Sequence, residues 1–300
     1  MRKWILFFLL TMSSQAKAVN TCGNDLNVNC WECGANCIAR LNEQTGLFSI
    51  EAKDENAPVG QMTGYEWDGE NQRPKTPWVE KLKSIQSVSL PDSLTNIGSY
   101  AFAYTNISSI NLPDSIQRIE GSAFQGADLL KEINTPPNLQ SVGSWSFAGT
   151  KIDHLILGQA QTQIPRRAFA YTKLKNLEIP EGVTSINWTA FAGISTLETL
   201  VIPDSVISID DEAFTNTNLQ KLYCAASEDV CSRIALQSGK NPRIINYSKT
   251  PDGKYHIGGK TYASIDAMQK GDYIPKRIYT VEEATKLSKK TGNTFKLKYK

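Results

Sequence analysis

Histidine is scarce in this 300-residue chain, which contains only His154 and His256. Neither lies in a motif that pairs it with a nucleophile or with further metal ligands. The chain also lacks the G-x-S-x-G motif of hydrolases, the H-E-x-x-H motif of zinc proteases and a glycine-rich phosphate-binding loop. We therefore predict that the protein is not an enzyme and needs no cofactor. A hydrolase carried on a repeat scaffold, with two carboxylates brought together by folding, ranks last among the alternatives.

An excess of one charge is missing as well, because 32 basic residues stand against 30 acidic ones and the net charge is +2. This balance gives no overall field for a nucleic-acid partner. Residues 276–300 are an exception, since eight basic residues there oppose Glu282 and Glu283, which leaves a net charge of +6. Two interpretations stay open: a solvated face with lysines that protect an edge strand, or attachment to an anionic surface polymer or membrane.

Long hydrophobic runs are absent, since none reaches the roughly 20 residues that a transmembrane helix needs. At the start of the chain, a basic pair precedes the apolar run Trp4–Leu10, and Ala16 and Ala18 supply the small residues that a signal peptidase needs. The sequence therefore predicts a signal peptide over residues 1–18 and a mature start at Val19. We expect a secreted or cell-surface protein, or a periplasmic one in a Gram-negative source.

The six cysteines form two groups. The members are Cys22, Cys30, Cys33 and Cys37 in the first group and Cys224 and Cys231 in the second. Export to an oxidising compartment favours disulfides, and an even count fits them. The first group allows three pairings, and its C-x-x-C spacing also suits a four-sulfur zinc site as an alternative. We expect local disulfides, with Cys224 and Cys231 closing a small loop and no metal bound.

The middle of the chain is periodic. Three kinds of position recur every 22 or 23 residues. They are the phenylalanines Phe102, Phe124, Phe147, Phe169, Phe191 and Phe214, the aliphatics Ile97, Ile119, Val142, Ile164, Ile186 and Ile209, and the prolines Pro91, Pro113, Pro136, Pro180 and Pro203, with Gly158 replacing one proline. One shared period at three positions predicts a solenoid of stacked coils.

One unit shows how a coil is built. Leu177 and Ile179 alternate with polar residues, as a strand with one buried face requires, and the following Pro180 ends that strand. Phe191 then places a large ring in the stack, where the next coil covers it. Six such units and a partial seventh predict a β-rich leucine-rich repeat solenoid with short parallel strands.

The wording L-x-x-L-x-I-P-x-x-V-x-x-I-x-x-x-A-F resembles the BspA-type leucine-rich repeat of bacterial and protozoan surface proteins, over about residues 84–224. The preceding Gly60-Gln61-Met62, Tyr65 and Pro77-Trp78 resemble the leader of such repeats. The resemblance implies a secreted or surface protein used for adhesion or recognition, without catalytic residues. Departures from the pattern at Thr135, and at Gly158 with Gln161, predict an irregularity around the fourth coil.

Both ends of a solenoid expose apolar surface and need caps. We expect four segments: a signal peptide at 1–18, a cysteine-containing cap at 19–83, the solenoid at 84–224, and a cap with a small α+β module at 225–300. The expected elements of the caps are strands at 37–41 and 47–50, a hairpin at 255–262, a helix from a Thr280/Glu283 capping box to about Lys290, and a last strand at 295–299.

Equivalent positions of successive coils line up into rows, which predicts two candidate contact surfaces. The first is the outward strand face, for which we select Asn111, Glu132, Asn134, His154, Asn176 and Glu178, with Ser87, Ser89, Ser109, Ile156, Thr199 and Val201 in the same rows. The second is an aromatic edge near the Ala-Phe turn, made by Tyr100, Tyr104, Trp145, Tyr171 and Trp188. Aromatic side chains are frequent contact residues, but packing between coils is their alternative use.

Two functions from different classes follow. The first is a scaffold that binds a protein or glycan on a host or neighbouring cell, and the second is a structural envelope component without a soluble ligand. Asn106, Asn187 and Asn246 each begin an N-x-Ser/Thr sequon, which matters only in a eukaryotic source.

Overall fold

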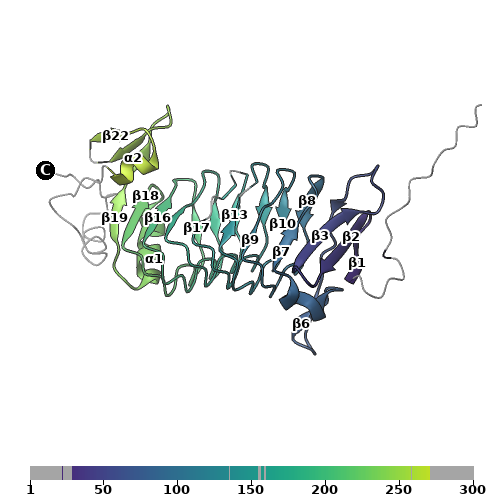
Figure 1. The fold of residues 1–300 in the computed structure, drawn as a ribbon. Coiled ribbons are helices and arrows are strands. Elements are labelled where there is room, and N and C mark those ends of the chain that lie inside the picture. The colour runs from purple at the N-terminus through teal and green to yellow at the C-terminus, as the bar shows by residue number, and fades with distance from the viewer. Residues whose placement is uncertain are drawn as a thin grey trace, which may run out of the picture.

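The computed structural model describes residues 22, 29–134, 136–154, 157–158, 160–257 and 259–270. These residues form a β-solenoid of about seven turns, with coils stacked side by side along one axis (Figure 1). The solenoid prediction is confirmed. The signal peptide, the capping box and the basic tail, with the expected last strand, lie outside the described residues, as do Thr135 and Ile156.

The short strands of successive coils form two rows. The first row contains β7 (Ser87–Ser89), β9 (Ser109–Ile110), β11 (Glu132–Ile133), β14 (Asn176–Glu178), β16 (Thr199–Ile202), β18 (Lys221–Cys224) and β19 (Arg243–Asn246). The second row contains β4 (Gly60–Gln61), β8 (Leu94–Ile97), β10 (Arg118–Ile119), β12 (Ser141–Val142), β13 (Gln163–Ile164), β15 (Ser185–Ile186) and β17 (Ser208–Ile209). In the first row β9 pairs with β11, and β14, β16, β18 and β19 pair in that order, all in parallel. In the second row β4, β8, β10 and β12 pair in order, as do β13, β15 and β17.

The second row is interrupted at the fourth coil, where β12 does not pair with β13. The first-row position of this coil falls at residues 155–156, outside the described residues. The buried side chain of Gln161 takes over part of the second ladder, because its Oε1 accepts the backbone N–H of Val142 at 3.1 Å. The irregularity therefore falls where Gly158 and Gln161 depart from the repeat pattern.

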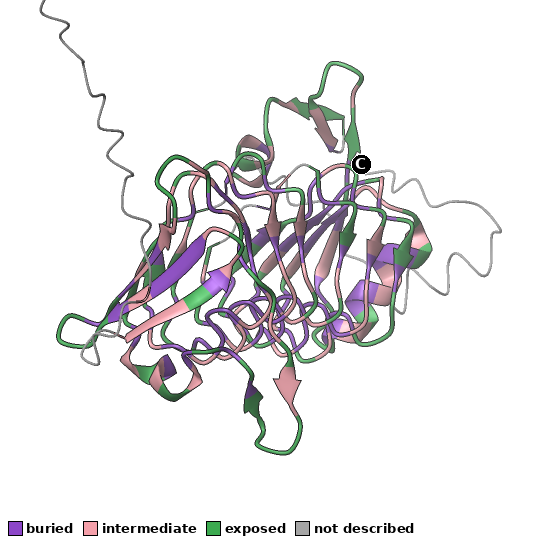
Figure 2. Cartoon of the chain, turned by 90° about the vertical axis from the view of Figure 1, so that its right-hand side faces the viewer, coloured by how far each residue is buried: buried purple, intermediate pink, exposed green. Residues whose placement is uncertain are grey.

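A column of phenylalanine rings forms the centre of the core. Consecutive rings from Phe102 to Phe214 have centroids 5.3 to 5.7 Å apart and lie within 19° of parallel. All six rings are buried, and the end-on view of Figure 2 shows the buried segments gathered inside the solenoid. Burial of each ring contributes about 2–3 kcal/mol, so the column stabilises every coil against its neighbours.

The turns that carry these rings are also held from coil to coil. The backbone N–H of each phenylalanine from Phe102 to Phe191 donates to a carbonyl of the next coil at 2.8–2.9 Å. In four coils a buried threonine hydroxyl donates to the phenylalanine carbonyl three residues earlier. These are Thr105, Thr150, Thr172 and Thr217. The Ala-Phe turn is thus a third, hydrogen-bonded edge of the solenoid.

The N-terminal cap is an antiparallel sheet of β1 (Asn29–Gly34), β2 (Cys37–Asn42) and β3 (Leu47–Ala52). β3 pairs in parallel with β7, so the cap extends the first row. Trp78 seals the junction: its side chain is buried, its ring lies 5.0 Å from that of Phe48, and its Nε1 donates to the carbonyl of Ala101 at 2.9 Å. The rest of the leader forms the hairpin β5 (Trp67–Asp68) and β6 (Arg73–Pro74) and the short helix η1 (Val79–Ser84).

The C-terminal cap begins with α1 (Glu228–Ser238), which contacts β17 and β18 of the last coils. The sequence predicts a small loop closed by Cys224 and Cys231 here, whereas the structure has a helix. Beyond β19, the chain forms β20 (Ser248–Lys249), the expected hairpin β21 (Tyr255–Ile257) and β22 (Lys260–Tyr262), and α2 (Ile265–Lys270). We call β20, β21, β22 and α2 the C-terminal module.

Candidate functional site

A hollow of about 440 Å³ lies on the outward face of the first row. Its lining comes from three successive coils and comprises Ser109, Ile110, Asn111, Lys131, Glu132, Ile133, Asn134, Asp153 and His154. It ends at the fourth coil, next to residues 155–156, which lie outside the described residues. Four of the six residues selected on the strand face, Asn111, Glu132, Asn134 and His154, are thereby brought to one place.

The polar groups of the hollow differ in whether they already have a partner within the protein. Asn134 is committed to the backbone, because its Oδ1 accepts the N–H of Leu112 at 2.6 Å and its Nδ2 donates to the carbonyl of the same residue at 2.8 Å. Lys131 and Asp153 face each other with Nζ and Oδ2 3.8 Å apart. Glu132 and His154 are exposed. The hollow therefore offers charges of both signs and an imidazole to a polar ligand.

Sequence reasoning missed Lys131 and Asp153, since each lies next to the positions that alternate in and out along the strand. The sequence feature that could have identified them is their position directly before two selected residues, Glu132 and His154. The reason they line the hollow is that strands in this row are only two residues long here, so that flanking residues reach the same surface.

Asn176 and Glu178 lie on β14, outside the hollow. Glu178 lies at the margin of the C-terminal module, where partial burial, and then the neighbouring Glu181, raise the pKa of its carboxyl. Lys249 of the module opposes this rise, and its Nζ is 3.0 Å from a carboxylate oxygen of Glu181. Glu178 is thus a boundary residue between the strand face and the module.

Val201 was expected on the outward face but is buried, with only 1% of its side-chain surface exposed. It belongs to a second hydrophobic cluster in which the C-terminal module covers the outward positions of the last strands. The cluster contains Val201, Tyr223, Ile245, Tyr247, Ile257 and Met268. This prediction was wrong because the C-terminal module, far along the chain from β16, covers the outward position of Val201.

The five residues of the aromatic edge fall into separate groups. Tyr100 and Tyr104 pack against Trp67 of the leader hairpin, with centroids 5.9 and 6.0 Å apart. Tyr171 is 59% exposed, and its ring lies against Gly193 of the next coil. Trp145 and Trp188 instead flank the guanidinium of Arg167. Packing between coils therefore accounts for part of this edge.

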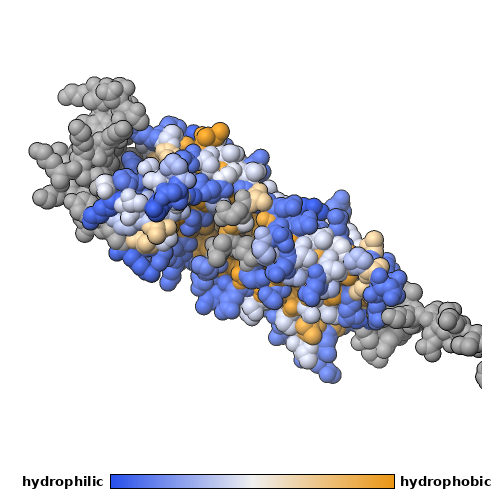
Figure 3. Space-filling view, turned by 90° about the horizontal axis from the view of Figure 1, so that it is seen from above, coloured by the Kyte–Doolittle hydropathy of each residue, from blue (hydrophilic) through white to orange (hydrophobic). Residues whose placement is uncertain are grey.

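Hydrophilic residues dominate the face of the molecule seen in Figure 3. Among the described residues, the large hydrophobic side chains that are exposed lie in different coils and caps. They are Leu47, Leu129, Tyr171, Ile207 and Leu236. The described part of the chain has no helix long and apolar enough to cross a membrane.

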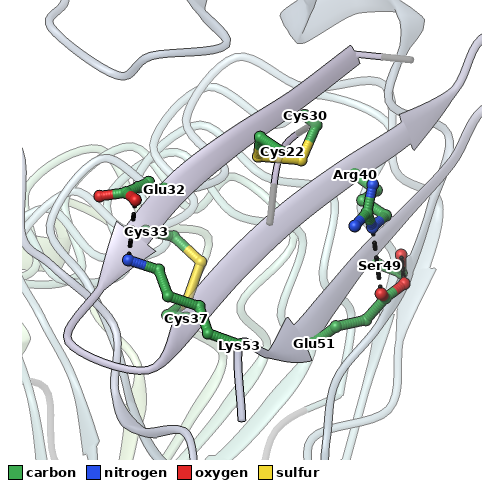
Figure 4. Close-up of a disulfide and its surroundings, with 9 residues drawn as sticks. All are labelled: Cys22, Cys30, Glu32, Cys33, Cys37, Arg40, Ser49, Glu51 and Lys53. Carbon is green, nitrogen blue, oxygen red and sulfur yellow. Dashed lines mark hydrogen bonds and ion pairs between the residues drawn. A yellow bond between two sulfur atoms is a disulfide. The ribbon is translucent and has the colours of Figure 1, made fainter. Parts of the chain in front are cut away.

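Each of the six cysteines forms a disulfide with a cysteine four to eight residues away in the sequence. The disulfides are Cys22–Cys30 and Cys33–Cys37 in the N-terminal cap (Figure 4) and Cys224–Cys231 at the last coil. The pairing that the sequence left open thus joins Cys22, upstream of β1, to Cys30 within β1, and joins Cys33 to Cys37 across the turn between β1 and β2. Paired sulfurs do not act as zinc ligands, and no group of three or more potential metal ligands occurs in the described segments.

Solved structures similar to this chain include several bacterial leucine-rich repeat proteins. One from Eubacterium ventriosum is 18% identical and covers 77% of this chain and 48% of its own, with a TM-score of 0.43. One from T. pallidum is 21% identical and covers 71% of this chain and 98% of its own, with a TM-score of 0.45. This chain therefore spans about half the length of the E. ventriosum protein.

A search of curated proteins found no match. The sequence family described as the BspA type leucine rich repeat region matches in six copies, over residues 80–171 and 162–265. The two matched ranges join into one that covers more than half of the chain, and they include the phenylalanine column and every strand of the two rows except β4. The protein therefore belongs to the family of BspA-type leucine-rich repeat proteins.

Proposed function

We propose that the protein is a secreted or surface-exposed scaffold that binds a protein or glycan ligand through the outward face of coils two to four. The observation that carries this proposal is the hollow lined by Asn111, Lys131, Glu132, Asp153 and His154. It lies on strands held by the core and leaves polar side chains of both charge signs open to solvent.

Rigidity of the supporting strands favours binding. A ligand that docks on a surface already ordered by its own core does not have to supply the entropy of ordering it. Ile110 between Ser109 and Asn111 is buried, which fixes the direction of its two neighbours. The C-terminal module covers the row from β16 onward, so the open face ends at about β14.

The test is a screen of the full-length mature protein against arrays of surface proteins and glycans, followed by titration of each hit. Glu132→Lys reverses a charge in the hollow and is expected to weaken binding about tenfold or more. Glu70→Lys makes the same change in the exposed turn between β5 and β6 and serves as the control. A saturable ligand whose affinity is unchanged by Glu132→Lys would show that the binding site is not the hollow. The absence of any saturable ligand would favour the structural envelope component.

Secretion is tested separately by mapping the peptides of the naturally produced protein without reduction. The expected result is a mature start at Val19, with all six cysteines in disulfides. An intact Met1 with free thiols would contradict export.

A further inference from the structure

Two tryptophans and two arginines from three successive coils form a ladder on the Ala-Phe edge. The guanidinium carbon of Arg167 lies 4.4 Å from the ring centroid of Trp145 and 4.7 Å from that of Trp188. The guanidinium carbon of Arg166 lies 4.4 Å from the Trp188 ring. One arginine is thus held between two indoles, and a second lies against the same indole. We call Trp145, Arg166, Arg167 and Trp188 the Trp–Arg ladder.

Backbone and side-chain hydrogen bonds hold the ladder in place. The N–H of Trp145 donates to the carbonyl of Arg166 at 3.1 Å, and the N–H of Arg167 donates to that of Trp188 at 3.2 Å. The Nε of Arg167 donates to Oγ1 of Thr189 at 3.1 Å. The guanidinium of Arg167 therefore has a restricted set of conformations before any ligand arrives, which lowers the entropy cost of binding one.

The charge of the ladder is not neutralised by the described residues. Arg40, Arg73 and Arg233 each form an ion pair with a carboxylate, whereas Arg166 and Arg167 have no carboxylate oxygen within 4.0 Å among the residues that the structure describes. In a later coil, Asp210 accepts from the backbone N–H of Trp188 and Asp211 pairs with Arg233.

The surrounding sequence adds to this positive charge. Residues 151–175 contain five basic residues, Lys151, Arg166, Arg167, Lys173 and Lys175, and a single acidic one, Asp153. Asp153 already faces Lys131. The fourth coil is therefore a local basic band in a chain whose net charge is only +2.

We propose that the Trp–Arg ladder binds the anionic groups of an acidic polysaccharide. A guanidinium stacked by its face keeps its edge free, and that edge is a planar fork of N–H donors that matches carboxylate and sulfate oxygens. The indoles add apolar surface beside the donors, which suits a pyranose ring that carries an anion. Trp145 and Trp188 lie two coils apart, or about 10 Å, so a sugar chain lying along the solenoid axis meets each side chain of the ladder in turn.

This site is distinct from the strand-face hollow, so either proposal can fail without the other. Glu132→Lys tests the hollow and leaves the ladder unchanged. Substitutions in the ladder leave the hollow unchanged, because no residue is shared between the two sites.

The test measures binding of the full-length mature protein to four polymers. Polygalacturonate carries carboxylates only, dextran sulfate carries sulfates only, dextran is neutral, and polyglutamate is an acidic peptide. Saturable binding is expected to at least one acidic polysaccharide and not to dextran, and it should weaken as NaCl rises from about 50 to about 500 mM. The arm that binds identifies the anion as uronate carboxylate or sulfate.

The double variant Arg166→Gln/Arg167→Gln removes both charges at similar size and should weaken binding about tenfold or more. Arg167→Lys keeps the charge but loses the planar fork, and should lie in between. The control is Lys240→Ala/Lys260→Ala, which changes the net charge equally at two exposed lysines outside the ladder. Thermal unfolding of each variant checks that the coils remain intact.

Three results would overturn the proposal. These are no saturable binding to either acidic polysaccharide, an equal loss in the lysine control, and binding to polyglutamate as tight as to the polysaccharides. If the glutamine variant unfolds, Arg167→Lys decides, because unaltered affinity in a folded Arg167→Lys protein rules out recognition through the guanidinium fork.

Discussion

At the residue scale, the fold places bulky side chains at positions where the backbone is left-handed. The second residue before each phenylalanine has a positive φ, including 59° at Tyr100, 63° at Trp145 and 54° at Arg167. Each such residue costs about 1–2 kcal/mol relative to ordinary backbone, and the hydrogen bonds between turns offset this cost. The backbone conformation of the turn is therefore the same in each coil, whereas the side chain at this position varies from coil to coil.

Gly193 is a residue whose identity the structure requires. Its φ is +73°, and a Cβ added there would overlap the ring of Tyr171 in the preceding coil. We predict that Gly193→Ala lowers the free energy of unfolding by about 1–2 kcal/mol, measured by urea denaturation. In a Tyr171→Ala background the same substitution should cost less, since the overlap is gone. An equal cost in both backgrounds would assign the whole effect to the backbone.

Glu178 provides a test of pH dependence. Its carboxyl has a pKa above the ordinary 4.5, chiefly because of partial burial beside the C-terminal module. A raised pKa in the folded state means that stability from this group is present at low pH and is lost as the pH rises through the folded value. We predict that Glu178→Gln raises the melting temperature at pH 7 but not at pH 4. Glu70→Gln, in an exposed turn, is the control, and the same gain at both pH values would contradict the assignment.

At the element scale, the strands were predictable because they are local. Leu177 and Ile179 alternate with Asn176 and Glu178, and nothing from outside the coil is needed to place that strand. α1 could have been found too, because Ser227 caps its start, Glu228 and Asp229 follow, and Gly239 ends it with a φ of +68°. The prediction for this segment rested on Cys231 and gave a loop closed by a disulfide, although the cysteine lies within a helix.

The disulfide at this helix is expected to hold the last cap. Cys224 ends β18 and Cys231 lies in the first half of α1, seven residues later, so the bond ties the helix across the end of the core. Replacing both cysteines by serine should lower stability by about 2–3 kcal/mol, measured by urea denaturation of the mature protein. The double serine variant of Cys22 and Cys30 is the comparison, because its loop has eight residues but ties only the edge strand β1. A larger loss there would show that the N-terminal cap limits stability.

At the scale of the whole molecule, the sequence predicts the solenoid and its period but not what the far end of the chain does to it. Val201 has the alternation of an outward residue, but it is buried in a cluster that includes Ile257 and Met268, more than fifty residues away. Likewise, the hollow is lined by residues of three successive coils, which come together only when the coils stack. Local patterns therefore predict the coils, and long-range packing decides which surfaces stay open.

The C-terminal module is predicted to be required for solubility. A chain that ends at residue 246 would expose Val201, Tyr223 and Ile245, which together form an apolar strip across three strands. It should associate in size-exclusion chromatography, whereas a chain that ends at residue 270 should not. Val201→Thr with Ile245→Thr in the shorter chain should restore the monomer. A monomeric chain ending at residue 246 would contradict the role of the module as a cover.

The phenylalanine column also decides how the protein responds to force. Successive coils are joined by ring stacking and by hydrogen bonds, and none of the three disulfides links one coil to another. A pull on the ends of the chain therefore detaches coils singly, and each releases 22 or 23 residues, or roughly 75 Å of extended chain. A molecule held at a surface in flowing liquid would therefore lengthen in nearly equal steps, and each step would dissipate part of the load. The coils that are still folded would keep their outward strand surface intact.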